Sequence, residues 1–308
     1  MATETVTTPR SPLSVRLTAG WLDRETILGY FLLTPALVIL VLFLAYPFLY
    51  GIWLSLTNAE IGGAPAEFIG LQNFVYLFKS DPIYLRTIVN TFEYTFVTVV
   101  FKFGLGLVMA AVLNVGFRFN RALRAAMLLP YIVPTVLSTL AWLWMFDSTY
   151  SVFNWVLLHW FGIHGPIWLS SSPWPMISLM IVNIWRGVPF FGVLLLAAMQ
   201  TVPQDLYEAA AVDGANAFHR WLFVTIPTIR PVILITTLLS IITTFSDFQV
   251  IWILTRGGPV NSTHVIGTYA FQTGISGTSI GLGAAIALTM FPLLIVMTGV
   301  VLWLLRRE

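Results

Sequence analysis

The chain has no cysteine among its 308 residues and only two lysines, Lys79 and Lys102. The absence of cysteine excludes disulfide bonds and thiol chemistry. Neither lysine lies in the pattern G-x-x-x-x-G-K-[ST], so the sequence lacks the phosphate-binding loop of that class of ATPase. It also has no Ser/His/Asp arrangement, no paired carboxylates and no metal-ligand cluster. We therefore expect a protein that is not an enzyme and that carries no metal or cofactor of its own.

Charged residues are scarce as well. Only 9% of the residues are charged, against about 25% in an ordinary soluble domain, and 58% are hydrophobic. A bilayer core of ~30 Å needs about 20 helical residues, and six apolar stretches are long enough to cross it. We predict an all-α membrane protein with six transmembrane helices. The six stretches are approximately residues 27–56, 88–115, 122–146, 174–199, 232–254 and 280–305.

The positive charges predict the orientation of these spans, because cytoplasmic segments are enriched in lysine and arginine. With the N-terminus inside, the inside segments hold Arg10, Arg16, Arg24, Arg118, Arg121, Arg124, Arg220, Arg230, Arg306 and Arg307, and the outside segments hold Lys79, Arg86 and Arg256. This bias predicts that both termini are cytoplasmic. The predicted organisation is an N-terminal tail of residues 1–26 followed by a six-helix domain of residues 27–308.

The most informative polar stretch is the predicted cytoplasmic loop of residues 200–230. Pro203 suits the start of a helix. Glu208 places negative charge near the positive end of that helix, and Gly214 can adopt the left-handed conformation that ends it. A second short helix is expected to end before Pro227. These features predict a rigid exposed helix to which another protein docks; the alternative is an amphipathic helix that lies on the membrane surface.

The spacing within this loop resembles a family signature. The pattern Glu-Ala-Ala, three residues, Gly, nine residues, an aliphatic residue, any residue and aliphatic-Pro is similar to that of permease subunits of binding-protein-dependent ATP-binding-cassette (ABC) importers. The motifs Ile-Trp-Arg-Gly-Val-Pro (184–189), Leu-Pro-Tyr-Ile-Val-Pro (129–134) and Thr-Arg-Gly-Gly-Pro (255–259) resemble the sugar branch, specifically the shorter six-helix relatives of the first maltose-type permease. The resemblance assigns coupling to Glu208, Ala209, Ala210, Asp213, Gly214 and Pro227.

The resemblance implies a type I ABC importer permease fold in a bacterial or archaeal cytoplasmic membrane. The helix after Pro203 would be the coupling helix, seated in a cleft of an ATPase subunit. Two such subunits would bind ATP and Mg and drive alternating access. The other implied partners are a second permease, expected to be a different chain, an external sugar-binding protein and membrane lipid. No nucleic-acid partner is expected.

Three charged residues lie inside predicted spans, which by default marks them as functional and facing the bundle interior. They are Lys102, Arg186 and Asp247. At 1.5 Å per residue, Arg186 lies ~18 Å and Asp247 ~12 Å from the outer end of its span, so direct or water-mediated contact between them is expected. The two side chains form either a polar wall for a sugar or a structural ion pair. Lys102 has no predicted partner.

The resemblance also suggests where a sugar binds. In maltose-type permeases the contacts come from the span before the coupling helix and from the stretch before the Thr-x-Gly-Gly-Pro motif. The charged Arg186 and Asp247 differ from the maltose subunit, so maltose itself is not specified. The matching or neighbouring residues here are Asn183, Arg186, Gly187, Phe190, Ser240, Thr243, Thr244, Asp247 and Phe248.

Two alternatives to sugar import by an ABC system remain at this point. Arg186 suits a phosphate group, which favours a phosphorylated polyol such as glycerol 3-phosphate, although Asp247 would repel an anion. An ion-coupled secondary transporter also carries intramembrane charges, but it would more often show inverted repeats and interrupted helices. It would also have no need of the docking helix.

Overall fold

The structure, a computed structural model, describes residues 25–116 and 118–306. Within this part of the chain the fold is all-helical, and extended segments pair only at one isolated antiparallel bridge between Thr57 and Phe68. The predicted all-α class is therefore confirmed for the described residues. Most of the predicted N-terminal tail, with Arg10, Arg16 and Arg24, lies outside them, as does Arg307.

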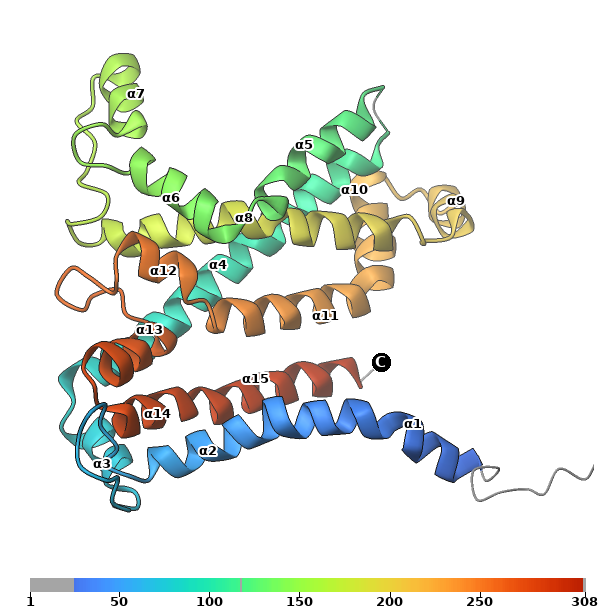
Figure 1. The fold of residues 1–308 in the computed structure, drawn as a ribbon. Helices are drawn as coiled ribbons and strands as arrows, with labels where there is room; N and C mark the ends of the chain where they lie inside the picture. Colours follow the sequence, from blue (N-terminus) through green and yellow to red (C-terminus); the bar gives the residue numbers. More distant parts are fainter. Residues whose placement is uncertain (1–24, 117, 307–308) are drawn as a thin grey trace, which may run out of the picture. The chain divides into compact units, whose positions relative to one another are not determined.

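The chain divides into two compact units, residues 1–51 and 52–308. In the first, α1 (Glu25–Leu40), the π-helical turn η2 (Val41–Ala45) and the start of α2 (Tyr46–Ser55) follow one another without a break (Figure 1). The N–H of Tyr46 donates to the carbonyl of Val41, one residue further back than in an α-helix. This wider turn accommodates the following Pro47, which has no N–H to donate.

The second unit contains the other long helices, the predicted cytoplasmic loop and the residues predicted to contact a solute. The longest helix, α4, crosses α8, and α11 lies against both of them. Figure 1 labels most of these elements. In order they are α3 (Gln72–Lys79), α4 (Pro82–Asn114), α5 (Asn120–Ile132), α6 (Thr135–Met145), α7 (Val152–Phe161), α8 (Trp174–Met199), α9 (Gln204–Val212), α10 (Ala217–Arg220), η3 (Trp221–Thr225), α11 (Ile226–Phe245), α12 (Gln249–Leu254), α13 (Ile266–Phe271), η4 (Gln272–Ser276), α14 (Ile280–Leu288) and α15 (Met290–Leu305).

Five helices of the described chain are long and apolar enough to cross a membrane, and a bent pair makes a sixth if it counts as one span. The predicted spans 174–199 and 280–305 coincide with candidate spans. The starts predicted at residues 88 and 232 were late, because the first turns of these helices are more polar and carry less apolar signal. The start predicted at residue 27 was one residue early. The five candidates are Leu28–Ser55, Pro82–Asn114, Trp174–Met199, Ala217–Leu254 and Ile280–Leu305.

The predicted third span, residues 122–146, is not one straight helix. Its two halves, Arg121–Ile132 and Thr135–Met145, meet at an angle of 90°. Val133 and Pro134 between them have extended ψ values of 132° and 133°. A proline disfavours helical conformation in the residue before it, so Pro134 stops α5 and starts α6 in a new direction.

The predicted end of the second loop helix before Pro227 is wrong. Instead, α10 continues through η3 into α11. The N–H of Ile226 donates to the carbonyl of Trp221, which is again a π-helical bond. As at Pro47, a widened turn immediately before the proline lets the helix pass through it.

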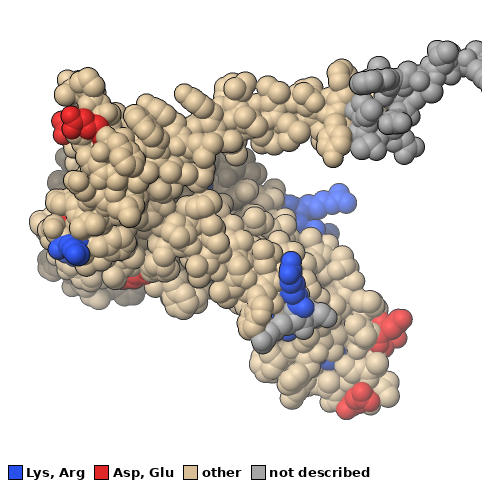
Figure 2. All heavy atoms as spheres, turned by 90° about the horizontal axis from the view of Figure 1, so that it is seen from below, with Lys and Arg blue, Asp and Glu red and all other residues tan. Residues whose placement is uncertain are grey.

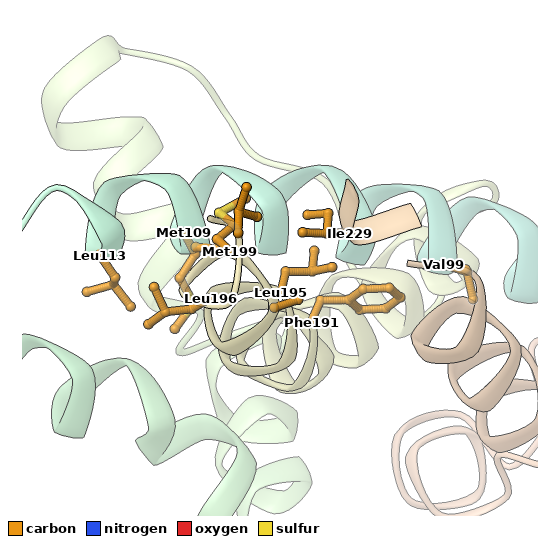
Figure 3. Close-up of a cluster of buried hydrophobic side chains, with 11 residues drawn as sticks. Val99, Met109, Leu113, Phe191, Leu195, Leu196, Met199 and Ile229 are labelled. Carbon is orange, nitrogen blue, oxygen red and sulfur yellow. The ribbon is translucent and has the colours of Figure 1, made fainter. Parts of the chain in front are cut away.

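The main apolar core of the second unit lies where α4 crosses α8 (Figure 3). Figure 3 shows Met109 and Leu113 of α4 near Leu196 and Met199 of α8. Two glycines permit this close approach. A Cβ on Gly106 would lie 2.3 Å from the Cβ of Phe191, and one on Gly192 would lie 2.6 Å from the sulfur of Met109. Small residues at a helix crossing are the usual way in which membrane helices pack closely.

Charged side chains are few on the face drawn in Figure 2. Most of that face consists of uncharged residues, with lysine, arginine and acidic side chains in small separate patches. Such a surface suits contact with lipid, where a charge is costly.

We expect Gly106→Leu to destabilise the protein, because the new side chain must displace the backbone of α8 at Phe191. Overpacking of this kind costs about 1–3 kcal/mol. The matched control is Gly104→Leu on the same helix, since a Cβ there meets nothing within 4 Å. Thermal unfolding in detergent should give a midpoint several degrees lower for Gly106→Leu alone. Equal midpoints for the two variants would contradict this packing.

Candidate functional site

A cavity of about 180 Å³ opens between α4, α5, α8 and the C-terminal half of α11. It brings together eight of the nine residues predicted to contact a solute; Phe248 does not line it. It also includes Lys102 and Tyr131, for which no solute contact was predicted. The lining residues are Lys102, Tyr131, Asn183, Arg186, Gly187, Phe190, Ser240, Thr243, Thr244 and Asp247.

Asp247 lies at a break in the helix, between the end of α11 and the start of α12. Its backbone N–H donates to the carbonyl of Thr244 at 3.0 Å. One carboxylate oxygen, Oδ2, accepts hydrogen bonds from the Tyr94 hydroxyl at 2.8 Å and from Nδ2 of Asn183 at 2.7 Å. The carboxylate thus joins α4, α8 and the α11–α12 break. Among the described residues, no ion pair between Arg186 and Asp247 is present.

Lys102 on α4 is the residue whose partner the sequence did not reveal. Only 5% of its surface is exposed, and its ammonium donates to Oγ1 of Thr244 at 2.8 Å. The lysine side chain passes over Gly187 of α8, where a Cβ would lie 2.5 Å from Cε of Lys102. Gly187 therefore makes room for the lysine to reach the cavity.

Asn183 is oriented by the carboxylate, because only its NH₂ group can donate to Asp247. Its carbonyl oxygen Oδ1 is buried and has no hydrogen-bond partner among the described residues. A buried acceptor without a partner is costly, so this oxygen is an unsatisfied polar atom within the cavity wall. Arg186 lies one helical turn further along α8 and is partly exposed in the same cavity.

The two aromatic residues in the predicted solute-binding set have different surroundings. Phe190 lines the cavity and stacks on Tyr131 of α5, with ring centroids 6.0 Å apart. Phe248 stacks on Trp252 and meets Phe271 edge to face. Phe248 is therefore part of an aromatic cluster in α12 and α13, away from the cavity lining.

The predicted docking helix is α9, with Pro203 immediately before its first residue. The side chains of Glu208, Ala209 and Asp213 are exposed, and Ala210 is partly exposed. Gly214 has a φ of +84°, so it ends the helix in the left-handed conformation that favours glycine. Pro227, by contrast, lies in the first turn of α11.

A hydrogen bond fixes α9 to the helix that follows it. The Tyr207 hydroxyl lies 2.9 Å from Oγ1 of Thr225, which is buried in η3. Because η3 continues into α11, and α11 ends beside Asp247, a continuous helical segment leads from the Tyr207–Thr225 contact to the cavity.

The Thr-Arg-Gly-Gly-Pro motif forms a tight loop between α12 and α13. Gly257 has a φ of +84°, and a Cβ there would lie 2.1 Å from Cε1 of His264. Burial lowers the pKa of His264 to about 4, so this imidazole is neutral near pH 7. Among the described residues, no group of three or more His, Asp or Glu side chains is placed to hold a metal ion.

Comparison with known proteins identifies the family. The model of the family "Binding-protein-dependent transport system inner membrane component" matches residues 102–308. A sulfoquinovosyl glycerol transport system permease from Agrobacterium fabrum is 34% identical, and the alignment covers 94% of each chain. A trehalose/maltose transport system permease from Thermococcus litoralis is also 34% identical, over 93% of this chain and 96% of the relative.

A solved structure supports the fold. A chain of a bacterial ABC transporter involved in the import of the acidic polysaccharide alginate superposes with a TM-score of 0.80 at 24% identity, covering 93% of this chain and 97% of that one. The predicted type I ABC importer permease fold is thereby confirmed. Permeases of this family do not hydrolyse ATP; they work with a second permease, separate ATPase subunits and a substrate-binding protein. The chain belongs to the family of inner membrane components of binding-protein-dependent transport systems, the permease subunits of ABC importers.

Proposed function

We propose that the chain moves a sugar from an external binding protein into the cytoplasm, through the cavity beside Asp247. The observation that supports this most is the convergence of eight predicted residues from α8 and α11 on one cavity. The cavity has groups that suit a sugar: charged donors at Arg186 and Lys102 and an aromatic ring at Phe190, with an unpaired amide oxygen of Asn183 buried in its wall. The names of the two relatives, both permeases for glycosides, agree with this class of solute.

The proposed movement is alternating access driven by α9 as a coupling helix. Both termini are cytoplasmic, the bent pair α5–α6 counts as one of six spans, and the loop of residues 200–230 faces the ATPase subunits. Closure of the two ATPase subunits on ATP shifts α9, and η3 and α11 carry the shift to the cavity. This is a rigid-body transition between two states. The second permease is a different chain that completes the solute path.

A phosphorylated polyol is the second candidate solute, favoured by the two cations Lys102 and Arg186 in one cavity. An ion-coupled secondary transporter does not fit the family, since its members are driven by a separate ATPase. ATP-dependent uptake by the reconstituted complex tests the choice, and uptake driven by an ion gradient without ATP would contradict the proposed function.

We expect Glu208→Lys to lower ATP-driven uptake at least tenfold, because it reverses the charge of the exposed side chain proposed to meet the ATPase. Gly214→Asp should act in the same direction by adding a side chain at a φ of +84°. Glu67→Lys, a charge reversal at another exposed loop position, is the control and should keep normal uptake. Uptake and membrane insertion are measured together. Normal uptake in both α9 variants would refute the coupling role.

We expect Gly187→Val to reduce uptake strongly without preventing insertion. The new side chain occupies the space of the Lys102 stem and displaces its ammonium from Thr244. Val193→Leu, on an exposed part of α8, is the matched control. Transport at the control's rate in Gly187→Val would show that the position of Lys102 does not matter for the solute path.

A further inference from the structure

The charges of the cavity do not cancel. Two cations, Lys102 and Arg186, and one anion, Asp247, line it. The formal sum at neutral pH is therefore one positive charge. Because the cavity lies among spans predicted to be surrounded by lipid, an uncompensated charge there is costly unless a ligand or a partner neutralises it.

Lys102 is the group that most needs a counter-ion. It is 5% exposed, and its hydrogen bond goes to a neutral hydroxyl, that of Thr244. An ammonium has three protons to donate, so two remain for another acceptor. Arg186 adds up to five more N–H donors to the same space.

Asp247 does not use these donors. Its Oδ2 accepts from Tyr94 and Asn183, both neutral, at 2.8 and 2.7 Å. The carboxylate is thus held in place by the walls of the cavity. The charged donors of Lys102 and Arg186 line the same cavity and suit a further acceptor. A solute with a negative group supplies such an acceptor, and charge-assisted hydrogen bonds to it are about twice as strong as neutral ones.

The same cavity also offers contacts for an uncharged sugar ring. The Asn183 Oδ1 atom lacks a donor, and a sugar hydroxyl is one. Phe190, stacked on Tyr131, presents an aromatic surface at the lining. The set of groups therefore fits a molecule that combines hydroxyl groups with an anion.

The size of the charge distinguishes between anions. A carboxylate or a sulfonate carries one negative charge and balances the cavity. A phosphate monoester carries about −1.5 to −2 at pH 7, which overcompensates and places excess negative charge near Asp247. A neutral sugar leaves the positive charge unbalanced.

We propose that this cavity selects a saccharide bearing a single negative charge, such as a uronate or a sulfonated sugar, over a neutral sugar or a phosphate ester. The proposal rests on the proposed function, because it names the solute of the same site.

The test measures binding to the complex of this chain with its partner subunits, purified in nanodiscs without the external binding protein. The probes are glucose, glucuronate and glucose 6-phosphate, which share one ring and differ in charge. Ligand-observed NMR titration should give at least tenfold tighter binding of glucuronate than of either other probe. Arg186→Gln and Lys102→Met should each remove most of this preference. Lys79→Met, at the chain's other lysine, is exposed on α3 and should not change it.

Equal binding of glucose and glucuronate, tighter binding of glucose 6-phosphate, or no binding of any probe would overturn the proposal. Arg186 is partly exposed, so Arg186→Gln keeps the test decisive if Lys102→Met does not fold. An unchanged preference in Arg186→Gln would also overturn it. ATP-driven uptake by the unaltered complex tests the proposed function separately. Its absence would contradict that function whichever probe binds best.

Discussion

The hydrogen bonds to Asp247 join three parts of this permease, α4, α8 and the break between α11 and α12. A carboxylate inside a membrane protein needs donors, and here Tyr94 of α4 and Asn183 of α8 supply them at the point where α11 gives way to α12. The three helices therefore meet at one polar point. The apolar core between α4 and α8 lies beside it and depends on Gly106 and Gly192 for its close packing. Polar and apolar contacts together fix the walls of the cavity.

One hydrogen bond and a continuous helical segment link α9, the proposed docking helix, to the cavity. The π-helical turn η3 keeps α10 and α11 in one piece through Pro227, and Tyr207 ties α9 to that turn through Thr225. In the proposed mechanism, a shift of α9 would pass along α11 through this contact. The same kind of turn occurs before Pro47 in the first unit. In both places the helix passes through a proline, and at Pro227 the sequence alone predicted a stop.

Much of the fold is readable from the sequence, for identifiable reasons. The span of residues 174–199 is bounded by polar or small residues and a proline, so its ends are clear. The loop of residues 200–230 carries a proline, an acidic first turn and a glycine with a positive φ, and each has a local cause. The 90° bend at Pro134 was missed because proline is common inside membrane helices and its effect depends on neighbouring helices.

The contacts within the cavity were harder to predict. Counting residues along two spans placed Arg186 and Asp247 near each other, and both line one cavity. It did not give the directions of their side chains, and no direct ion pair joins them among the described residues. The role of Tyr94 depends on which face of α4 meets α8, and an aromatic residue in an apolar helix carries no signal for this. Lys102 was recognised as an intramembrane charge, yet its path over Gly187 appears only when the helices are packed.

In the proposed mechanism, movement of α9 opens the cavity beside Asp247 to each side of the membrane in turn. Because the natural chain has no cysteine, Thr243→Cys places a single thiol of this chain in the cavity lining. Its labelling by a membrane-impermeant reagent is measured from each side of reconstituted vesicles that contain the whole transporter. We predict that the thiol is labelled from the cytoplasmic side without nucleotide and from the external side when the ATPase subunits are trapped closed. Labelling from one side only, whatever the state of the nucleotide, would contradict it.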